Sequence, residues 1–88
     1  MGQHRAIATL LGMALYFTND GATFRAESAE ELVDKLRADS FTPGASRADF
    51  MRESASRAGV LCGALVRDES PESFVSDLLA AGLLSIAN

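Results

Sequence analysis

The segment from Ser70 to Leu84 constrains the fold most, because fifteen residues contain the start, the apolar face and the end of one helix. Ser70 and Pro71 are typical of the N-cap and the first position of a helix. Gly82 is typical of the left-handed residue that follows a helix. The large apolar residues between them share one helical face: Phe74, Val75, Leu78 and Leu79. Such a face has to be covered, so the rest of the chain must supply elements that pack on it.

Residues 14–26 have the pattern of a β-hairpin, because aromatic and β-branched residues flank Asp20-Gly21. That pair is typical of a two-residue turn with positive φ angles. A two-residue turn would place Phe17 opposite Phe24. The predicted apolar face of the hairpin is Leu15, Phe17, Phe24 and Ala26, and the predicted polar face is Tyr16, Thr18, Thr23 and Arg25.

Two further helices are predicted from a serine that stands three residues before an acidic residue, which is the spacing of a capping box. Ser28 and Glu31 begin a helix that should reach about Ala38. Ser46 begins another with Asp49, and this helix should continue at least to Ala58. Its end is left open between Ala58 and Leu65, because Gly59 and Gly63 disfavour a helix while the apolar face continues past them.

These elements predict a small α+β fold, in which a β-hairpin is covered on one face by three short helices. A hairpin alone is marginally stable in water, so we expect a third short strand beside it at Ala64–Arg67. Leu84, Ser85 and Ile86 would either pack back or form an edge. Residues 1–12 are predicted to be a leader, either mobile or a first strand, ahead of a single domain at 13–88. The predicted core is Leu15, Phe17, Phe24, Leu32, Leu36, Phe41, Phe50, Met51, Leu65, Phe74, Val75, Leu78 and Leu79.

The composition argues against several functional classes. Cys62 is the only cysteine among the 88 residues, so no disulfide can form within the chain, and a reducing, cytoplasmic location is expected. The net charge of −4 argues against direct nucleic-acid contact, because proteins that bind the phosphate backbone usually carry a basic surplus. The apolar run from Ala6 to Phe17 is too short to span a bilayer, so no membrane partner is predicted.

His4 and Cys62 are the candidates for catalysis or metal binding, and each is the only residue of its type. His4 lies in the predicted leader, whereas a catalytic base has to be held in place by its neighbours. Cys62 has no base or cation near it in the sequence to stabilise a thiolate, which predicts a buried, unreactive side chain. One cysteine and one histidine cannot complete a structural zinc site. We therefore predict no enzyme activity, no metal and no cofactor.

By elimination, the sequence predicts a non-catalytic protein–protein interaction module, such as a small bacterial adaptor or regulator. Its partner would be another protein or a second copy of the chain. The candidate partner-facing residues are acidic and surround the first helix: Glu27, Glu30, Glu31, Asp34 and Asp39. Glu30 and Asp34 are like charges four residues apart, which slightly destabilises a helix and therefore suggests an external use. The alternative is an acidic inhibitor or mimic acting on a nucleic-acid-handling enzyme, and the third reading is a small subunit of an enzyme complex.

Overall fold

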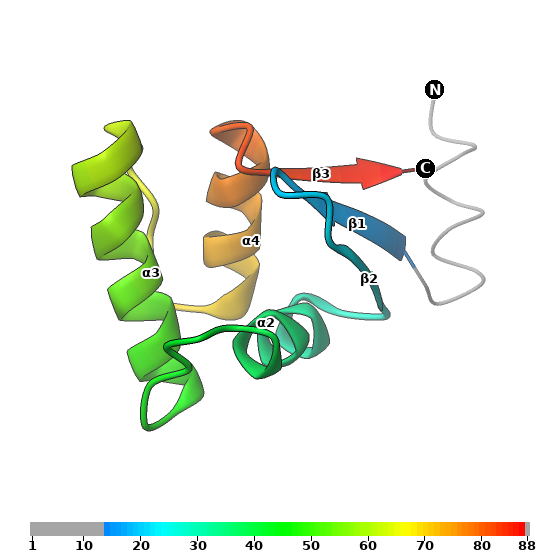
Figure 1. Cartoon of the computed structure of the whole chain (residues 1–88), viewed down its shortest axis with the longest axis horizontal. Coiled ribbons are helices and arrows are strands. Elements are labelled where there is room, and N and C mark those ends of the chain that lie inside the picture. Colours follow the sequence, from blue (N-terminus) through cyan, green and yellow to red (C-terminus); the bar gives the residue numbers. More distant parts are fainter. Residues whose placement is uncertain (1–13, 88) are drawn as a thin grey trace.

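A computed structural model describes residues 14–87 of the chain (Figure 1). The leader predicted at residues 1–12 lies outside the described residues. Within the described part of the chain, three antiparallel strands and three helices confirm the predicted α+β fold. The elements of residues 14–87 are β1 (Ala14–Thr18), β2 (Thr23–Ala26), α2 (Ala29–Ala38), α3 (Arg47–Cys62), α4 (Pro71–Ala80) and β3 (Leu84–Ala87).

The strand order is β2-β1-β3, so the first strand lies in the middle and the last strand lies beside it. The third strand is therefore Leu84–Ala87, and the prediction of a strand at Ala64–Arg67 is wrong. The reason is the end of α4, where Gly82 takes a φ of 77°. The N–H of Leu83 then donates to the carbonyl of Leu78 at 3.0 Å, a turn that sends the chain back along β1.

The hairpin turn has three residues, Asn19 to Gly21, rather than the predicted two, because Thr18 lies opposite Ala22. This difference moves the register of the two strands by one residue. Gly21 has a φ of 92°, and the N–H of Thr18 donates to the carbonyl of Ala22 at 2.9 Å. Tyr16 consequently pairs with Phe24, and Phe17 pairs with Thr23. A shift of one residue exchanges the two faces of a strand.

The exchange of faces corrects the predicted sheet surface. Tyr16 packs against the core from the face that the helices cover, whereas Phe17 points to the other face and is 37% exposed. Leu15 shares the face of Phe17. Phe24 and Ala26 belong to the covered face, as predicted, and Leu84 of β3 joins them there, 3% exposed.

All three helices begin at the predicted serines. The side chains of Ser28, Ser46 and Ser70 each accept a hydrogen bond at 3.1 Å from the N–H three residues later. Helix α3 continues through Gly59 to Cys62, and Gly63 is its C-cap residue with a φ of 68°. The helix end that the sequence left open is thus at Cys62, which is exposed rather than buried.

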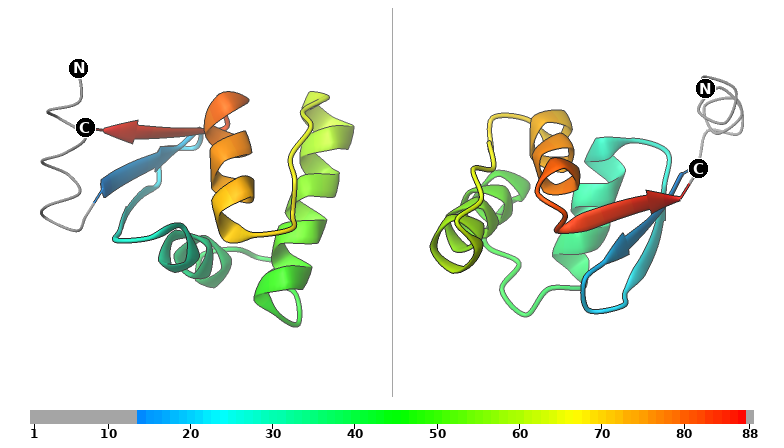
Figure 2. Two further views of the ribbon diagram at one scale, coloured as in Figure 1. Left: turned by 180° about the vertical axis from the view of Figure 1, so that it is seen from behind. Right: turned by 90° about the horizontal axis from the view of Figure 1, so that it is seen from above.

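The core lies between the sheet and the helices. Helices α2 and α4 pack on the sheet, and α3 packs on α2 and α4 from outside, so all three lie on one side of the sheet (Figure 2). The rings of Phe50 and Phe74 meet edge to face across the α3–α4 contact, with centroids 6.4 Å apart. The buried cluster is Ala26, Leu32, Val33, Phe50, Met51, Phe74, Val75 and Leu84.

Two residues of the predicted core lie in solvent: Phe41 is 104% exposed and Leu65 is 95% exposed. Leu65 belongs to the segment that joins α3 to α4, where the next residue, Val66, packs against the core instead. Neighbouring residues of an extended segment point in opposite directions, so Val66 turns inward and Leu65 turns outward. Phe41 belongs to the loop between α2 and α3, which Arg37 holds through the carbonyl of Pro43.

Candidate functional site

An open groove of about 360 Å³ lies between the hairpin turn, the end of α2, the middle of α3 and the side of α4. Figure 1 shows α4 between α3 on one side and the hairpin on the other. The floor of the groove is formed by large apolar side chains from all four: Phe24, Leu36, Phe50, Phe74 and Leu78. Phe50 and Phe74 are buried, whereas the other three are only partly buried. The groove therefore offers apolar surface to a ligand at the boundary of the core.

The rim of the groove is polar and carries charges of both signs. Asp20 of the hairpin turn and Asp39 at the end of α2 contribute carboxylates, and Arg57 of α3 contributes a guanidinium. Asp20 accepts a hydrogen bond from the Thr18 hydroxyl and another from the N–H of Ala22, which together lower the pKa of its carboxyl group. Arg57 donates to the Ser54 hydroxyl at 3.3 Å. Within residues 14–87, no hydrogen bond or ion pair joins Asp39 to Arg57.

Exposed apolar residues stand at the rim of the groove and further along α3. Phe41 lines the rim while almost all of its side chain faces solvent. Leu61 follows Arg57 by four residues on α3, so it continues the same side of the helix by one turn, and it is 77% exposed. Val60 and Leu65, which are 81% and 95% exposed, lie near the C-terminal end of α3 and do not line the groove. This much exposed apolar surface is typical of a site that another molecule covers.

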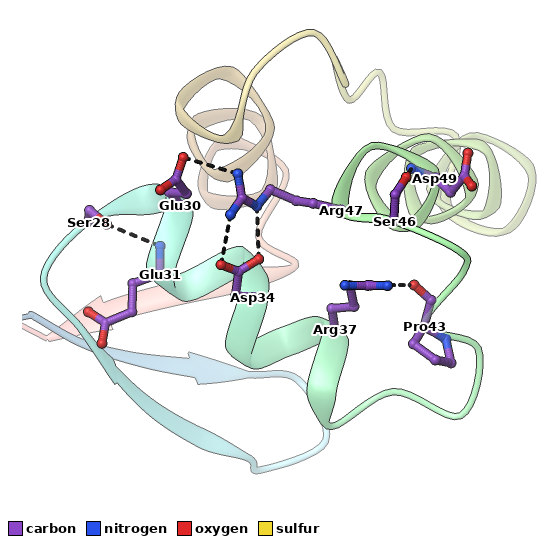
Figure 3. A network of polar contacts seen from close by, with 9 residues as sticks. All are labelled: Ser28, Glu30, Glu31, Asp34, Arg37, Pro43, Ser46, Arg47 and Asp49. Carbon is purple, nitrogen blue, oxygen red and sulfur yellow. Dashed lines mark hydrogen bonds and ion pairs between the residues drawn. The ribbon is translucent and has the colours of Figure 1, made fainter.

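The predicted acidic surface is divided by an ion-pair cluster (Figure 3). Arg47 of α3 binds Asp34 with two hydrogen bonds, from Nε at 2.8 Å and from Nη2 at 2.9 Å. Its Nη1 atom also donates to Glu30 at 3.0 Å. The two like charges on α2 are therefore bridged from within the chain, which gives their spacing a structural explanation.

The other three predicted acidic residues lie apart from this cluster. The carboxylate of Glu31 accepts a hydrogen bond from the N–H of Glu27 at 2.6 Å, so the reciprocal bond of the predicted capping box forms one residue before the N-cap Ser28. Its side chain points away from Arg47 in Figure 3. Glu27 and Asp39 are exposed at opposite ends of a helix about 15 Å long. A role for these five carboxylates in binding a partner stays a prediction, and only Asp39 lies on the groove.

Arg47 lowers the pKa of Asp34 through its hydrogen bonds, with a smaller contribution from its charge. We expect Arg47→Ala to raise the pKa of Asp34 toward the ordinary value for aspartate, as measured by NMR titration of the carboxyl carbon. A lowered folded-state pKa stabilises the fold above the unfolded-state pKa, and this stabilisation is lost as the pH falls through the folded-state value. The Arg47→Ala variant should therefore lose less stability than the wild type on acidification.

Arg67→Ala is the matched control for this titration. Arg67 donates to Asp77 from Nε at 2.9 Å and lowers the pKa of that carboxyl group in the same way. Its replacement should raise the pKa of Asp77 and leave Asp34 unchanged. An Asp34 pKa that is the same with and without Arg47 would contradict the assignment.

Of the two candidates for chemistry, the structure describes only Cys62. His4 lies outside the described residues, and Cys62 lies at the exposed end of α3. Between residues 14 and 87, no three histidine, cysteine, aspartate or glutamate side chains converge on a possible metal position. Helices of the length and apolar character needed to cross a bilayer are likewise absent from this part of the chain.

Sequence reasoning missed the groove, because its walls come from four elements that are far apart in the chain. The sequence signal nearest to the groove was the apolar face that continues past Gly59 to Leu61, one helical turn beyond the rim residue Arg57. No protein-family model, curated protein or solved structure matches this chain. The groove and its rim are therefore the features from which a function has to be inferred.

Proposed function

We propose that this chain is a non-catalytic protein-interaction module, a small adaptor or regulator that receives a bulky apolar side chain of a partner protein in the groove. One observation supports this proposal above the others: the groove is open to solvent, yet its floor is aromatic and aliphatic. Binding sites typically combine such a floor with a few polar groups at the rim that orient the ligand. Asp20, Asp39 and Arg57 are groups of this kind.

The size of the groove suits one or two anchoring side chains. An aromatic side chain buries about 150–250 Å² in a complex. At about 25 cal/mol per Å², one such anchor would contribute about 4–6 kcal/mol before the entropic cost of association is subtracted. A groove of about 360 Å³ therefore favours weak and reversible binding, as expected for an adaptor or a regulator.

The acidic-mimic alternative has less support. Two of the carboxylates that would have to resemble nucleic acid, Glu30 and Asp34, are bound by Arg47, which reduces the negative charge of that surface. The charged rim residues of the groove, Asp20, Asp39 and Arg57, form no ion pair within residues 14–87. We propose that the module acts in the cytoplasm, because its single cysteine, Cys62, is exposed and has no second cysteine with which to form a disulfide in the chain.

Selection of peptides from a random display library on the purified chain tests the proposal. Ser54 lines the groove from α3, so Ser54→Trp should fill the groove without removing any side chain from the core. Ser56→Trp places the same large residue at an exposed position two residues away on the same helix. Selected peptides should contain a bulky apolar residue, lose at least about tenfold in affinity on Ser54→Trp, and bind Ser56→Trp as they bind the wild type.

Two results would contradict the proposal. One is that the selected peptides bind both tryptophan variants equally. The other is that replacing the apolar residue of a selected peptide with serine leaves its affinity unchanged. Changes in the amide chemical shifts near Leu36 and Leu78, during a titration with a selected peptide, would locate the binding on the groove floor.

A further inference from the structure

Phe41 and the groove lie on the same side of the molecule, and each leaves apolar surface uncovered. Phe41 is 104% exposed, although it stands at the rim of a groove with an apolar floor. We propose that the groove of one copy receives Phe41 of a second copy, and the reverse, in a two-fold symmetric dimer in which Asp39 of each copy faces Arg57 of the other. This inference rests on the proposed function, because it names the occupant of the same groove.

The loop that carries Phe41 is fixed at the end that leads into α3. Arg37 donates from Nε to the carbonyl of Pro43 at 2.9 Å (Figure 3). It also donates from Nη2 to the carbonyl of Gly44 at 3.4 Å. Gly44 has a φ of 75° and lies against Asp49, so that end of the loop is fixed as well. A loop with its backbone held at this end presents Phe41 outward, where a second molecule can bind it.

The position of the anchor beside its receptor favours a second copy over an unrelated protein. A two-fold interface uses the same patch on both subunits, so an anchor and its receptor have to lie on one face of a single chain. Phe41 and the groove meet that condition, since Phe41 is itself a rim residue. One symmetric contact would then cover both exposed phenylalanines and both grooves.

The charges at the rim are complementary under the same symmetry. Asp39 precedes Phe41 by two residues, and Arg57 stands on the α3 side of the groove that Phe41 would enter. Asp39 is the C-cap residue of α2, where a negative side chain lies at the negative end of the helix dipole. A guanidinium from the second copy would offset that unfavourable position.

The dimer should be weak, because the contact is small. Two phenylalanine anchors bury about 300–500 Å², which is well below the roughly 1,200–2,000 Å² of a stable interface. Leu61, one turn beyond Arg57, can add to this area. We therefore expect reversible association that depends on concentration, measured by sedimentation equilibrium of the whole chain at concentrations up to about 1 mM.

Phe41→Ala tests the anchor. Truncating a central anchor commonly weakens a complex about 30-fold, and because the symmetry repeats the loss, the dimer should weaken by about 1,000-fold. The unfolding midpoint of the variant in dilute solution should equal that of the wild type, since the side chain is exposed in the single chain. Leu65→Ala removes a similarly exposed apolar residue that does not line the groove, and it should leave the dimer unchanged.

Two charge reversals test the orientation. Asp39→Arg and Arg57→Asp should each weaken self-association, because each homodimer would then contain two pairs of like charges that face each other. An equimolar mixture of the two variants should form a heterodimer, since each facing pair then has opposite charges. Asp39→Arg combined with Arg57→Asp in one chain should also restore the homodimer. Arg52→Asp, an exposed change elsewhere on α3, is the control.

The outcomes separate this inference from the proposed function. A wild-type chain that remains monomeric up to about 1 mM, or a dimer that Phe41→Ala leaves intact, would overturn the second copy as the occupant. If selected peptides nevertheless bound the groove and Ser54→Trp abolished their binding, the proposed function would stand with a different partner. A heterodimer that forms no better than either homodimer would overturn the pairing of Asp39 with Arg57.

Discussion

Replacing Phe74 with alanine is expected to lower the free energy of unfolding by about 3–5 kcal/mol, which is the largest effect among the substitutions considered. The Phe74 side chain is 1% exposed and packs edge to face on Phe50, so its removal loses buried apolar area and leaves a cavity between α3, α4 and the sheet. A domain of this length has only about 4–13 kcal/mol of stability in total. The melting temperature should therefore fall by at least about 12 °C, as measured by circular dichroism.

Phe41→Ala is the matched control for Phe74→Ala, because it removes the same side chain from a position that is 104% exposed. Its free energy of unfolding should stay within about 0.5 kcal/mol of the wild-type value when the protein is unfolded with urea in dilute solution. Equal losses of stability for the two phenylalanines would show that the core is not between the sheet and the helices as described.

Leu84→Ala is expected to lower the free energy of unfolding by about 2–5 kcal/mol. Leu84 begins β3 and is 3% exposed, so it joins the C-terminal strand to the core. Leu65→Ala, in the segment from which the sequence predicted a third strand, should change the stability by less than about 0.5 kcal/mol. Urea unfolding of the two variants compares the observed strand with the predicted one, and a larger loss for Leu65→Ala would contradict the sheet order β2-β1-β3.

The helix starts could be predicted from the sequence because they depend on residues close together in the chain. Ser28, Ser46 and Ser70 each cap a helix through an N–H only three residues away, and no tertiary contact is needed to identify them. The Gly82 stop was predictable for the same reason. Phe74 and Val75 followed from the helical spacing that these boundaries define.

The sheet was harder to predict because single residues decide it. Asp20-Gly21 fits a two-residue or a three-residue turn, and the choice between them placed Tyr16 against the core and Phe17 on the opposite face. The third strand could not be identified locally, because the short apolar segments at Ala64–Arg67 and Leu84–Ala87 are equally compatible with a strand. Pairing with β1 chose between them, and that pairing depends on where α4 ends.

The candidate site depended on tertiary structure to a greater degree. Charge patterning identified Glu30 and Asp34 as a notable pair, but their partner, Arg47, lies on the following helix. Phe41 was predicted to fill the core, since a phenylalanine in a loop usually does. Its exposure became visible only when the loop was placed against α2 by Arg37. The two features that support a function are therefore ones that sequence pattern could not reveal.

The central position of β1 has a consequence for the order of folding during synthesis. Its partner on one side, β2, follows after a three-residue turn, whereas on the other side Tyr16 pairs with Ile86. The hairpin and the helices α2, α3 and α4 all precede residues 84–87 in the chain, so they are synthesised before the residues that complete the sheet. Until then, one edge of β1 is unpaired and the place of Leu84 is unfilled, so the nascent chain offers an aggregation-prone edge that closes only with the last strand.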